Sequence, residues 1–142
     1  METSGDFEAE AMDEIARRVS PATLIRRDES LARHTTLRIG GPADAYVEPA
    51  SEHDLAAILA CCHDQGWPFL ILGRGSNLLV RDGGFRGVVV CLANPRFSGI
   101  EVTGECLRCG AGAYLKAVAV EARRNDLTGL EFMEGIPGTV GG

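Results

Sequence analysis

The chain has 142 residues, and its 14 basic and 20 acidic side chains give a formal net charge of −6. This length suits one domain, or an incomplete larger one. A composition of 45% hydrophobic and 24% charged residues is ordinary for a globular protein and argues against wholesale disorder. The acidic balance and the 6% aromatic content argue against nucleic-acid binding. No apolar stretch reaches the roughly 20 residues that a membrane-spanning helix needs.

The N-terminal segment indicates the cellular location of the protein. Residues 1–14 are acidic, whereas a signal peptide is basic and then apolar, so we predict a cytoplasmic protein. Without a secretory signal, an odd count of five cysteines predicts free thiols. We expect residues 1–30 to form a charged leader whose weak helix docks loosely and is broken by Pro21.

A βαβ unit is predicted from residue 45 onward. Residues 45–48 read as a short strand, and a helix follows with Ser51 as its cap and Asp54 in the capping-box position. Gly66 ends the helix. Residues 69–72 are an unbroken apolar run, typical of a strand buried on both faces. The expected buried face of the helix consists of Leu55, Ile58, Leu59 and Cys62.

Further elements follow in the second half of the chain. Residues 88–92 read as another buried strand, and 100–103 with 106–109 read as a hairpin about Gly104. A second helix has one apolar face, made of Leu115, Val118, Ala119 and Ala122.

Cysteine and histidine positions offer little chemistry. Cys106 and Cys109 are three apart in a predicted strand, where such positions point to opposite faces. No second pair is present to complete a zinc site. We therefore predict that these two cysteines are buried, that they act as small apolar residues, and that they bind no metal. The histidines, His34, His53 and His63, are expected to be surface or capping residues rather than bases.

Glycines are abundant, with 18 in the chain, and they cluster. The most informative cluster follows the second predicted strand: Gly73, Arg74, Gly75, Ser76 and Asn77. Two glycines allow positive φ, so that successive backbone N–H groups can surround an anion such as a diphosphate. The alternative, a tight structural turn, stays open on this motif alone.

Two common phosphate-binding motifs are excluded for this loop. The Rossmann fingerprint needs a third glycine where this chain has Leu78, followed directly by a helix. A Walker A loop needs a Gly-Lys-Ser/Thr sequence, and the single lysine of the chain is Lys116.

A second glycine-rich segment occupies residues 135–142. Four glycines and a proline among residues 135–142 carry a high cost in backbone entropy for an ordinary connection. Two such loops suggest the two sides of an elongated, multiply charged cofactor, although a glycine-rich tail without function is the alternative.

Three separated motifs carry a resemblance to a known family. The motifs are residues 34–44, residues 70–80, and residues 129–132 together with 135–142. They occur in the order and at the spacing found in that family. The chain resembles the UDP-N-acetylenolpyruvoylglucosamine reductases over about residues 30 to 142. The resemblance implies an α+β fold, the FAD-binding domain of the vanillyl-alcohol oxidase/PCMH type, with two α+β subdomains that hold non-covalent FAD.

The resemblance also implies an activity and a set of contacts. The family uses NADPH to reduce FAD, which then reduces UDP-N-acetylglucosamine enolpyruvate to UDP-N-acetylmuramate for peptidoglycan. It implies that residues 73–77 hold the FAD diphosphate and that Thr36 to Gly40 are a weaker candidate segment. From the other side the flavin and phosphates would be contacted by Gly138, Thr139, Gly141 and Gly142.

The family's catalytic residues follow the second glycine loop, so no residue of this chain inherits a catalytic role. Glu131 and Glu134 flank the loop, and we expect them to be solvated or capping residues. We therefore expect an N-terminal piece of a larger enzyme: residues 31–99 as the first FAD-binding subdomain, 100–142 as the start of the second, and no substrate domain. A non-catalytic FAD-binding fragment, or another oxidoreductase of the same fold, is the alternative.

Overall fold

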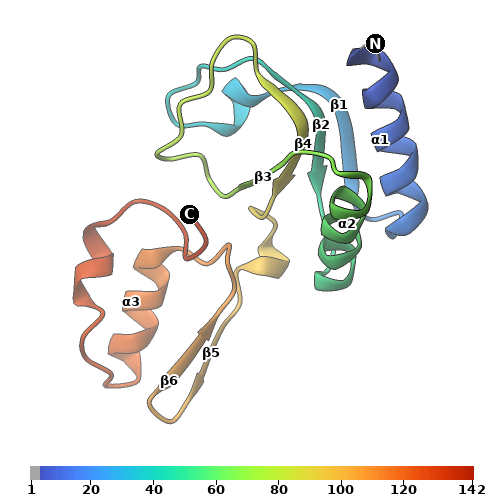
Figure 1. Cartoon of the computed structure of the whole chain (residues 1–142). Coiled ribbons are helices and arrows are strands. Elements are labelled where there is room, and N and C mark those ends of the chain that lie inside the picture. The colour runs from blue at the N-terminus through green and yellow to red at the C-terminus, as the bar shows by residue number, and fades with distance from the viewer. Residues whose placement is uncertain (1–3) are drawn as a thin grey trace.

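A computed structural model describes residues 4–142 of the chain, which form two α+β units joined near residue 95 (Figure 1). The first unit is a four-stranded sheet with two helices, and the second is a hairpin with one helix. In chain order the elements are α1 Ser4–Arg18, β1 Leu24–Ser30, η1 Leu31–His34, β2 Pro42–Glu48, α2 Glu52–Gln65, β3 Phe69–Leu72, β4 Phe85–Cys91, η2 Pro95–Phe97, β5 Ile100–Thr103, β6 Cys106–Cys109, α3 Leu115–Arg124 and η3 Glu131–Gly135.

The four-stranded sheet has the order β1-β2-β4-β3. β2, β4 and β3 run parallel, and β1 pairs antiparallel with β2. The predicted βαβ unit is present as β2, α2 and β3, but β4 lies between its two strands. The parallel strands therefore end at one common edge of the sheet, which is where α/β folds bind ligands.

The ends of α2 follow from its capping residues. The Ser51 hydroxyl accepts a hydrogen bond from the Asp54 backbone N–H at 3.0 Å, as the capping box predicts. Gly66 takes a left-handed conformation, with φ of 68°, and ends the helix. Ile58 and Cys62 are buried on the expected face.

The N-terminal residues differ from the sequence-based expectation. In α1 the side chains of Ala11 and Ile15 are fully buried against the sheet and α2, so this helix is part of the core rather than loosely docked. β1 adds an edge strand to the sheet. The charged leader predicted over residues 1–30 is therefore wrong for this part, because Ala11, Met12 and Ile15 form an apolar helical stripe that has a core to pack against. None of the helices within residues 4–142 is long and apolar enough to cross a bilayer.

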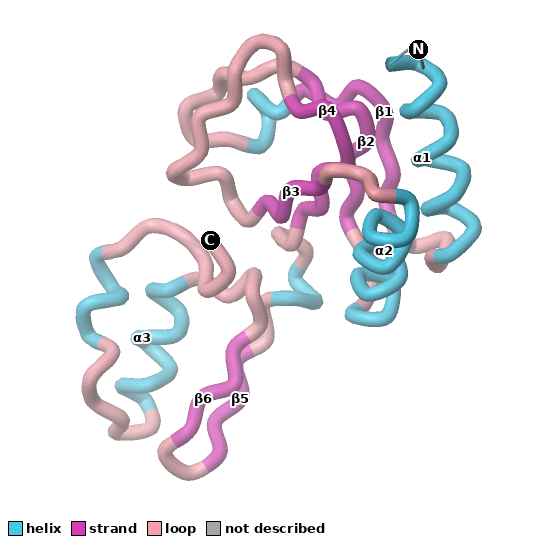
Figure 2. Tube along the Cα trace, in the orientation of Figure 1, coloured by secondary structure: helices cyan, strands magenta, loops and turns pink. Residues whose placement is uncertain are grey.

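The two faces of the sheet are covered differently (Figure 2). α1 and α2 cover one face, which we call the helix face, over a core that includes Val88 and Val90. Loops cover the other, the loop face, where Leu31, Tyr46 and Leu72 are buried. These loops comprise residues 31–41 and 73–84, and the first glycine loop is one of them.

β3 departs from its predicted environment. Phe69 is 47% exposed and Ile71 is 39% exposed, so the strand is not buried on both faces. The reason is topological, because β4 takes the central position and leaves β3 at the edge. In β4 the side chains of Val88, Val89 and Val90 are fully buried.

The second unit begins with the hairpin predicted about Gly104, formed by β5 and β6. α3 buries Val118 and Ala122 as expected. The cysteines of the hairpin are less buried than predicted, since Cys106 is exposed and Cys109 is half-buried. A two-stranded hairpin has only one layer of cover, which leaves its outer positions in solvent. All five cysteines are free thiols.

Candidate functional site

The first glycine loop is held against the segment before β2. Gly75 has a φ of 60°, which disfavours residues with a side chain. A Cβ atom at this position would overlap the His34 carbonyl oxygen and come within 2.9 Å of the Thr35 Cα. The Gly75 carbonyl accepts a hydrogen bond from the Thr36 backbone N–H at 3.0 Å. Glycine is therefore required here by close backbone approach.

The second glycine loop is fixed by hydrogen bonds to the segment before α3. The Val140 and Gly141 backbone N–H groups donate to the carbonyls of Ala113 and Ala111 at 2.9 and 2.8 Å. Thr139 is only 4% exposed, and its hydroxyl donates to the Gly142 carbonyl at 3.0 Å. A glycine-rich terminus with no anchoring side chains would be expected to fray. These backbone bonds and the buried threonine hold it instead.

The two loops meet although about 60 residues separate them in sequence (Figure 1). A Cβ atom on Gly73 would lie 2.6 Å from the Gly142 carbonyl oxygen and 3.1 Å from the Thr139 hydroxyl. One on Gly138 would lie 3.6 Å from the Ser76 hydroxyl. The structure thus brings both predicted loops into one site.

The remaining predicted residues take different places. Gly141 packs on Ala111, away from the first loop. Asn77 is exposed on its loop. The Arg74 guanidinium lies over the Tyr114 ring, with its central carbon 4.6 Å from the ring centroid, a cation–π geometry. Arg74 is exposed, and through this contact it links the two units.

Two cavities flank the Arg74 side chain and share it as a lining residue. The first, which we call the interloop cavity, has a volume of about 430 Å³ and lies between the two glycine loops. Its lining includes Thr36, Arg74, Ser76, Tyr114, Lys116 and Gly138. The second, the sheet-edge cavity, has a volume of about 450 Å³. Its lining includes Arg33, Thr35, Thr36, Arg38, Glu48, Gly73 and Arg74.

The sheet-edge cavity lies where the parallel strands end. Glu48 ends β2, Cys91 ends β4, and Gly73 follows β3, and all three line it. Arg33, Arg38 and Arg74 line it as well, so it has an excess of positive charge. Together with the backbone N–H groups of the glycine loop, this chemistry suits an anionic group such as a diphosphate.

The segment Thr36 to Gly40, the weaker candidate, contributes in part. Thr36 and Arg38 line the sheet-edge cavity, whereas Leu37 and Ile39 are exposed apolar side chains. Gly40 packs closely on the Val80 side chain instead.

A polar network forms part of the wall of the sheet-edge cavity, which His34, Tyr46 and Glu48 line. The His34 Nε2 is 2.8 Å from Glu29 Oε1, and its Nδ1 is 3.1 Å from the Tyr46 hydroxyl. The Tyr46 hydroxyl donates to Glu48 Oε1 at 2.8 Å. The hydrogen bond from His34 lowers the pKa of Glu29, and burial raises the pKa of Tyr46. The expectation of a surface or capping role for His34 is therefore wrong.

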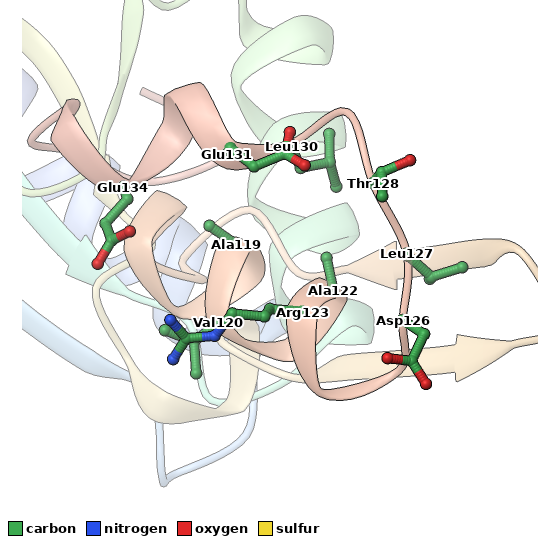
Figure 3. Close-up of a pocket in the computed structure, with 10 residues that line it drawn as sticks. All are labelled: Ala119, Val120, Ala122, Arg123, Asp126, Leu127, Thr128, Leu130, Glu131 and Glu134. Carbon is green, nitrogen blue, oxygen red and sulfur yellow. The ribbon is translucent and has the colours of Figure 1, made fainter.

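A third cavity, of about 340 Å³, lies beside α3 (Figure 3) and shares Glu134 with the interloop cavity. Ala119, Val120, Leu127 and Leu130 make much of its wall, with Glu131 and Glu134 at its margin. Glu131 is exposed and accepts a hydrogen bond at 2.9 Å from the backbone N–H of Gly129, which lies outside any helix. Among residues 4–142 no three metal-ligating side chains gather into a possible metal site.

The site as a whole fits an elongated cofactor with a central diphosphate. Two cavities are joined at Arg74, and the backbone between them leaves no room for a side chain at Gly73 or Gly75. Gly73 and Gly75 thus hold the loop against neighbouring backbone, and the cavities beside it have room for an anionic ligand.

Comparison with known proteins assigns this chain to a family. Residues 43–142 match the FAD binding domain family, and the chain belongs to this family. The predicted α+β FAD-binding fold is confirmed.

The relatives are more specific. The chain is 50% identical over 119 residues to the UDP-N-acetylenolpyruvoylglucosamine reductase of Geobacter sulfurreducens. The matched segment covers 83% of this chain and 39% of the relative. It is 44% identical over 130 residues to that of Rubrobacter xylanophilus, covering 92% and 43%. The crystal structure of the Thermus caldophilus enzyme is similar, with a TM-score of 0.59 and 32% identity over 84% of this chain and 41% of that one. The chain therefore spans about two fifths of the length of the relatives that it matches.

Several site residues were missed by sequence reasoning. Tyr114, Arg33 and Tyr46 line or support the cavities without belonging to a glycine motif. Tyr114 lies directly before α3. An aromatic residue at the start of a helix indicates a binding site only weakly, so the sequence did not single it out. The network residue Tyr46 lies in a strand that reads simply as buried.

Proposed function

We propose that this chain is the FAD-binding part of a flavin-dependent reductase that consumes NADPH. Its substrate is UDP-N-acetylglucosamine enolpyruvate and its product UDP-N-acetylmuramate, for peptidoglycan synthesis in the cytoplasm. The observation that carries the proposal is the meeting of the two glycine loops at Gly73, beside cavities lined by arginine. The names of the relatives at 44–50% identity support the substrate.

In this proposal the first glycine loop binds the FAD diphosphate. Gly73, Gly75, Ser76 and Asn77 present backbone and side-chain donors, and Arg74 supplies positive charge. The Tyr114 ring holds the Arg74 guanidinium in a fixed place, so less side-chain entropy is lost when the anion binds. From the other unit the cofactor is contacted by Gly138, Thr139, Gly141 and Gly142.

We assign residues 31–99, with α1 and β1 added, to the first FAD-binding subdomain, and residues 100–142 to the second. When bound, FAD would supply storage for a hydride between NADPH and the enolpyruvyl group. The residues of this chain bind and orient the cofactor, and none of them is assigned a role in transferring a proton to the substrate.

The test is a titration of the purified chain with FAD, followed by flavin fluorescence and absorbance. We expect saturable binding, and affinity at least about tenfold weaker for riboflavin, which lacks the diphosphate. Equal affinity for the two flavins would refute the diphosphate assignment. We also expect no NADPH-dependent turnover of the enolpyruvyl substrate by the purified chain. Measurable turnover would show that the chain holds catalytic residues that we have not assigned.

A further inference from the structure

Under the loop face of the sheet, four side chains form one continuous hydrogen-bonded chain, which we call the His34 relay. It runs from Glu29 on β1 through His34 to Tyr46 and Glu48 on β2. The His34 and Tyr46 rings are also stacked, with centroids 4.3 Å apart and an interplanar angle of 27°. Glu29 is held in place by Arg26, whose guanidinium lies 3.2 Å from the same carboxylate oxygen.

The imidazole of His34 is held at both of its ring nitrogens. Nε2 lies 2.8 Å from the Glu29 carboxylate, which only accepts hydrogen bonds, so Nε2 is the donor there. Nδ1 lies 3.1 Å from the Tyr46 hydroxyl, which also contacts Glu48. The ring is therefore fixed at two points.

The backbone of the same residue forms the floor of the first glycine loop. A Cβ atom on Gly75 would overlap the His34 carbonyl oxygen, so loop and segment are in direct contact there. The next residue but one, Thr36, donates its backbone N–H to the Gly75 carbonyl. Thr36 also lines both cavities beside Arg74. A shift of the His34 backbone would therefore move Gly75 and change the shape of both cavities.

We propose that His34 is a positioning residue for flavin binding: the His34 relay fixes the backbone of residues 34–36, on which the diphosphate loop rests. This inference depends on the proposed function, because it assigns to the loop the role of holding the FAD diphosphate. His34 also lines the sheet-edge cavity, and in this role it acts through the backbone rather than through contact with the cofactor. Its contribution is preorganisation, since a loop already held in the binding geometry loses less entropy on binding.

The experiment compares FAD affinity with loop order in three variants of the purified chain. His34→Leu removes both polar ends of the relay and keeps an apolar side chain. His34→Gln keeps one donor that can reach Glu29, and Tyr46→Phe removes only the hydroxyl. We expect the Kd for FAD to rise by about tenfold in His34→Leu, the contribution of about one hydrogen bond, and by less in the other two. His53→Leu, on the exposed side of α2 and on the opposite side of the sheet, is the matched control and should leave the Kd unchanged.

A second readout does not depend on FAD. Amide hydrogen exchange at Thr36 should become faster in His34→Leu than in the His53→Leu control, because the bond to the Gly75 carbonyl is loosened. Faster exchange with a raised Kd supports the inference. A Kd within about twofold of the unsubstituted chain refutes it, even if the melting temperature falls, since His34 would then be a structural residue only.

The inference and the proposed function fail in different ways. If the unsubstituted chain binds no FAD, the proposed function is wrong, and the inference falls with it. If it binds FAD and both Tyr46→Phe and His34→Gln bind equally well, the inference alone is wrong. Tyr46→Phe changes one oxygen atom and keeps the packed ring, so it decides the matter if His34→Leu does not fold.

Discussion

Replacing Gly75 by alanine tests whether the first glycine loop needs close backbone approach or merely a flexible turn. Gly75 and Gly104 have nearly the same φ, 60° and 59°. Both substitutions therefore carry the same backbone penalty, about 1–2 kcal/mol for a residue with a Cβ in this region. They differ in their surroundings, because a Cβ on Gly104 meets nothing within 4 Å, whereas one on Gly75 overlaps the His34 carbonyl oxygen.

The extra cost at Gly75 can be worked from these contacts. Relieving the overlap needs a backbone shift of about 1 Å, since carbon and oxygen atoms pack at roughly 3.4 Å or more. Such a shift breaks the 3.0 Å bond from Thr36 to the Gly75 carbonyl, with a net contribution of about 1 kcal/mol. We expect Gly75→Ala to destabilise the chain by about 2–3 kcal/mol and Gly104→Ala by about 1–2 kcal/mol.

The assay pairs urea unfolding with FAD titration for the two variants and the unsubstituted chain. A loop displaced by about an ångström no longer presents its N–H groups to one anion, so Gly75→Ala should bind FAD at least about tenfold more weakly. Gly104→Ala, in the distant hairpin turn, should keep its affinity. If Gly75→Ala and Gly104→Ala bind FAD equally well, the loop tolerates a side chain and our reasoning about Gly75 is wrong.

Three further predictions concern other parts of the molecule. The Asp54 carboxylate accepts hydrogen bonds from the Ser20 backbone N–H and hydroxyl and from Thr23, which lower its pKa from 3.8 to about 2. Its contribution to the free energy of unfolding is therefore complete above about pH 4 and is lost as the pH falls through 2; Asp54→Asn should remove this part of the pH dependence of urea unfolding. Tyr114→Leu should weaken FAD binding by about two- to fivefold and raise the salt sensitivity of binding, since Arg74 loses its aromatic support; an unchanged Kd would show that the stacking is incidental. With a thiol reagent at neutral pH, exposed Cys106 should react first, while Cys62, whose pKa burial raises to about 11, should react only after unfolding; simultaneous modification of both would contradict the burial.

Local patterns predicted much of the secondary structure, because the signals lie within a few residues. The cap at Ser51, the left-handed end at Gly66 and the hairpin about Gly104 depend only on neighbouring residues and their backbone preferences. The predicted burial of β3 on both faces was wrong because it depends on residues far away in the sequence. Whether Phe69 and Ile71 are covered depends on which strand lies beside them, and that strand begins 13 residues later in the chain.

The candidate site was predicted in outline but not in its supporting residues. Both glycine loops could be singled out, since glycine at such density has few structural explanations. Their contact through Gly73 and Gly142 follows from tertiary structure. The His34 relay was missed because its members lie in a short 3-10 helix and in strands whose sequence signals burial, not partnership. Hydrogen-bond partners across strands are set by register, which no local pattern fixes.

The central place of β4 in the sheet has a consequence for how the chain folds. The two strands of the βαβ unit, β2 and β3, form no hydrogen bonds with each other. A gap one strand wide separates them until β4, residues 85–91, inserts between them. On a ribosome, the segment up to residue 84 would therefore leave unpaired the two strand edges, one on β2 and one on β3, between which β4 later inserts. Closing them requires contacts between distant parts of the chain, a source of slow folding. Substitutions that weaken the valines of β4 should retard refolding more than equally destabilising changes in the hairpin.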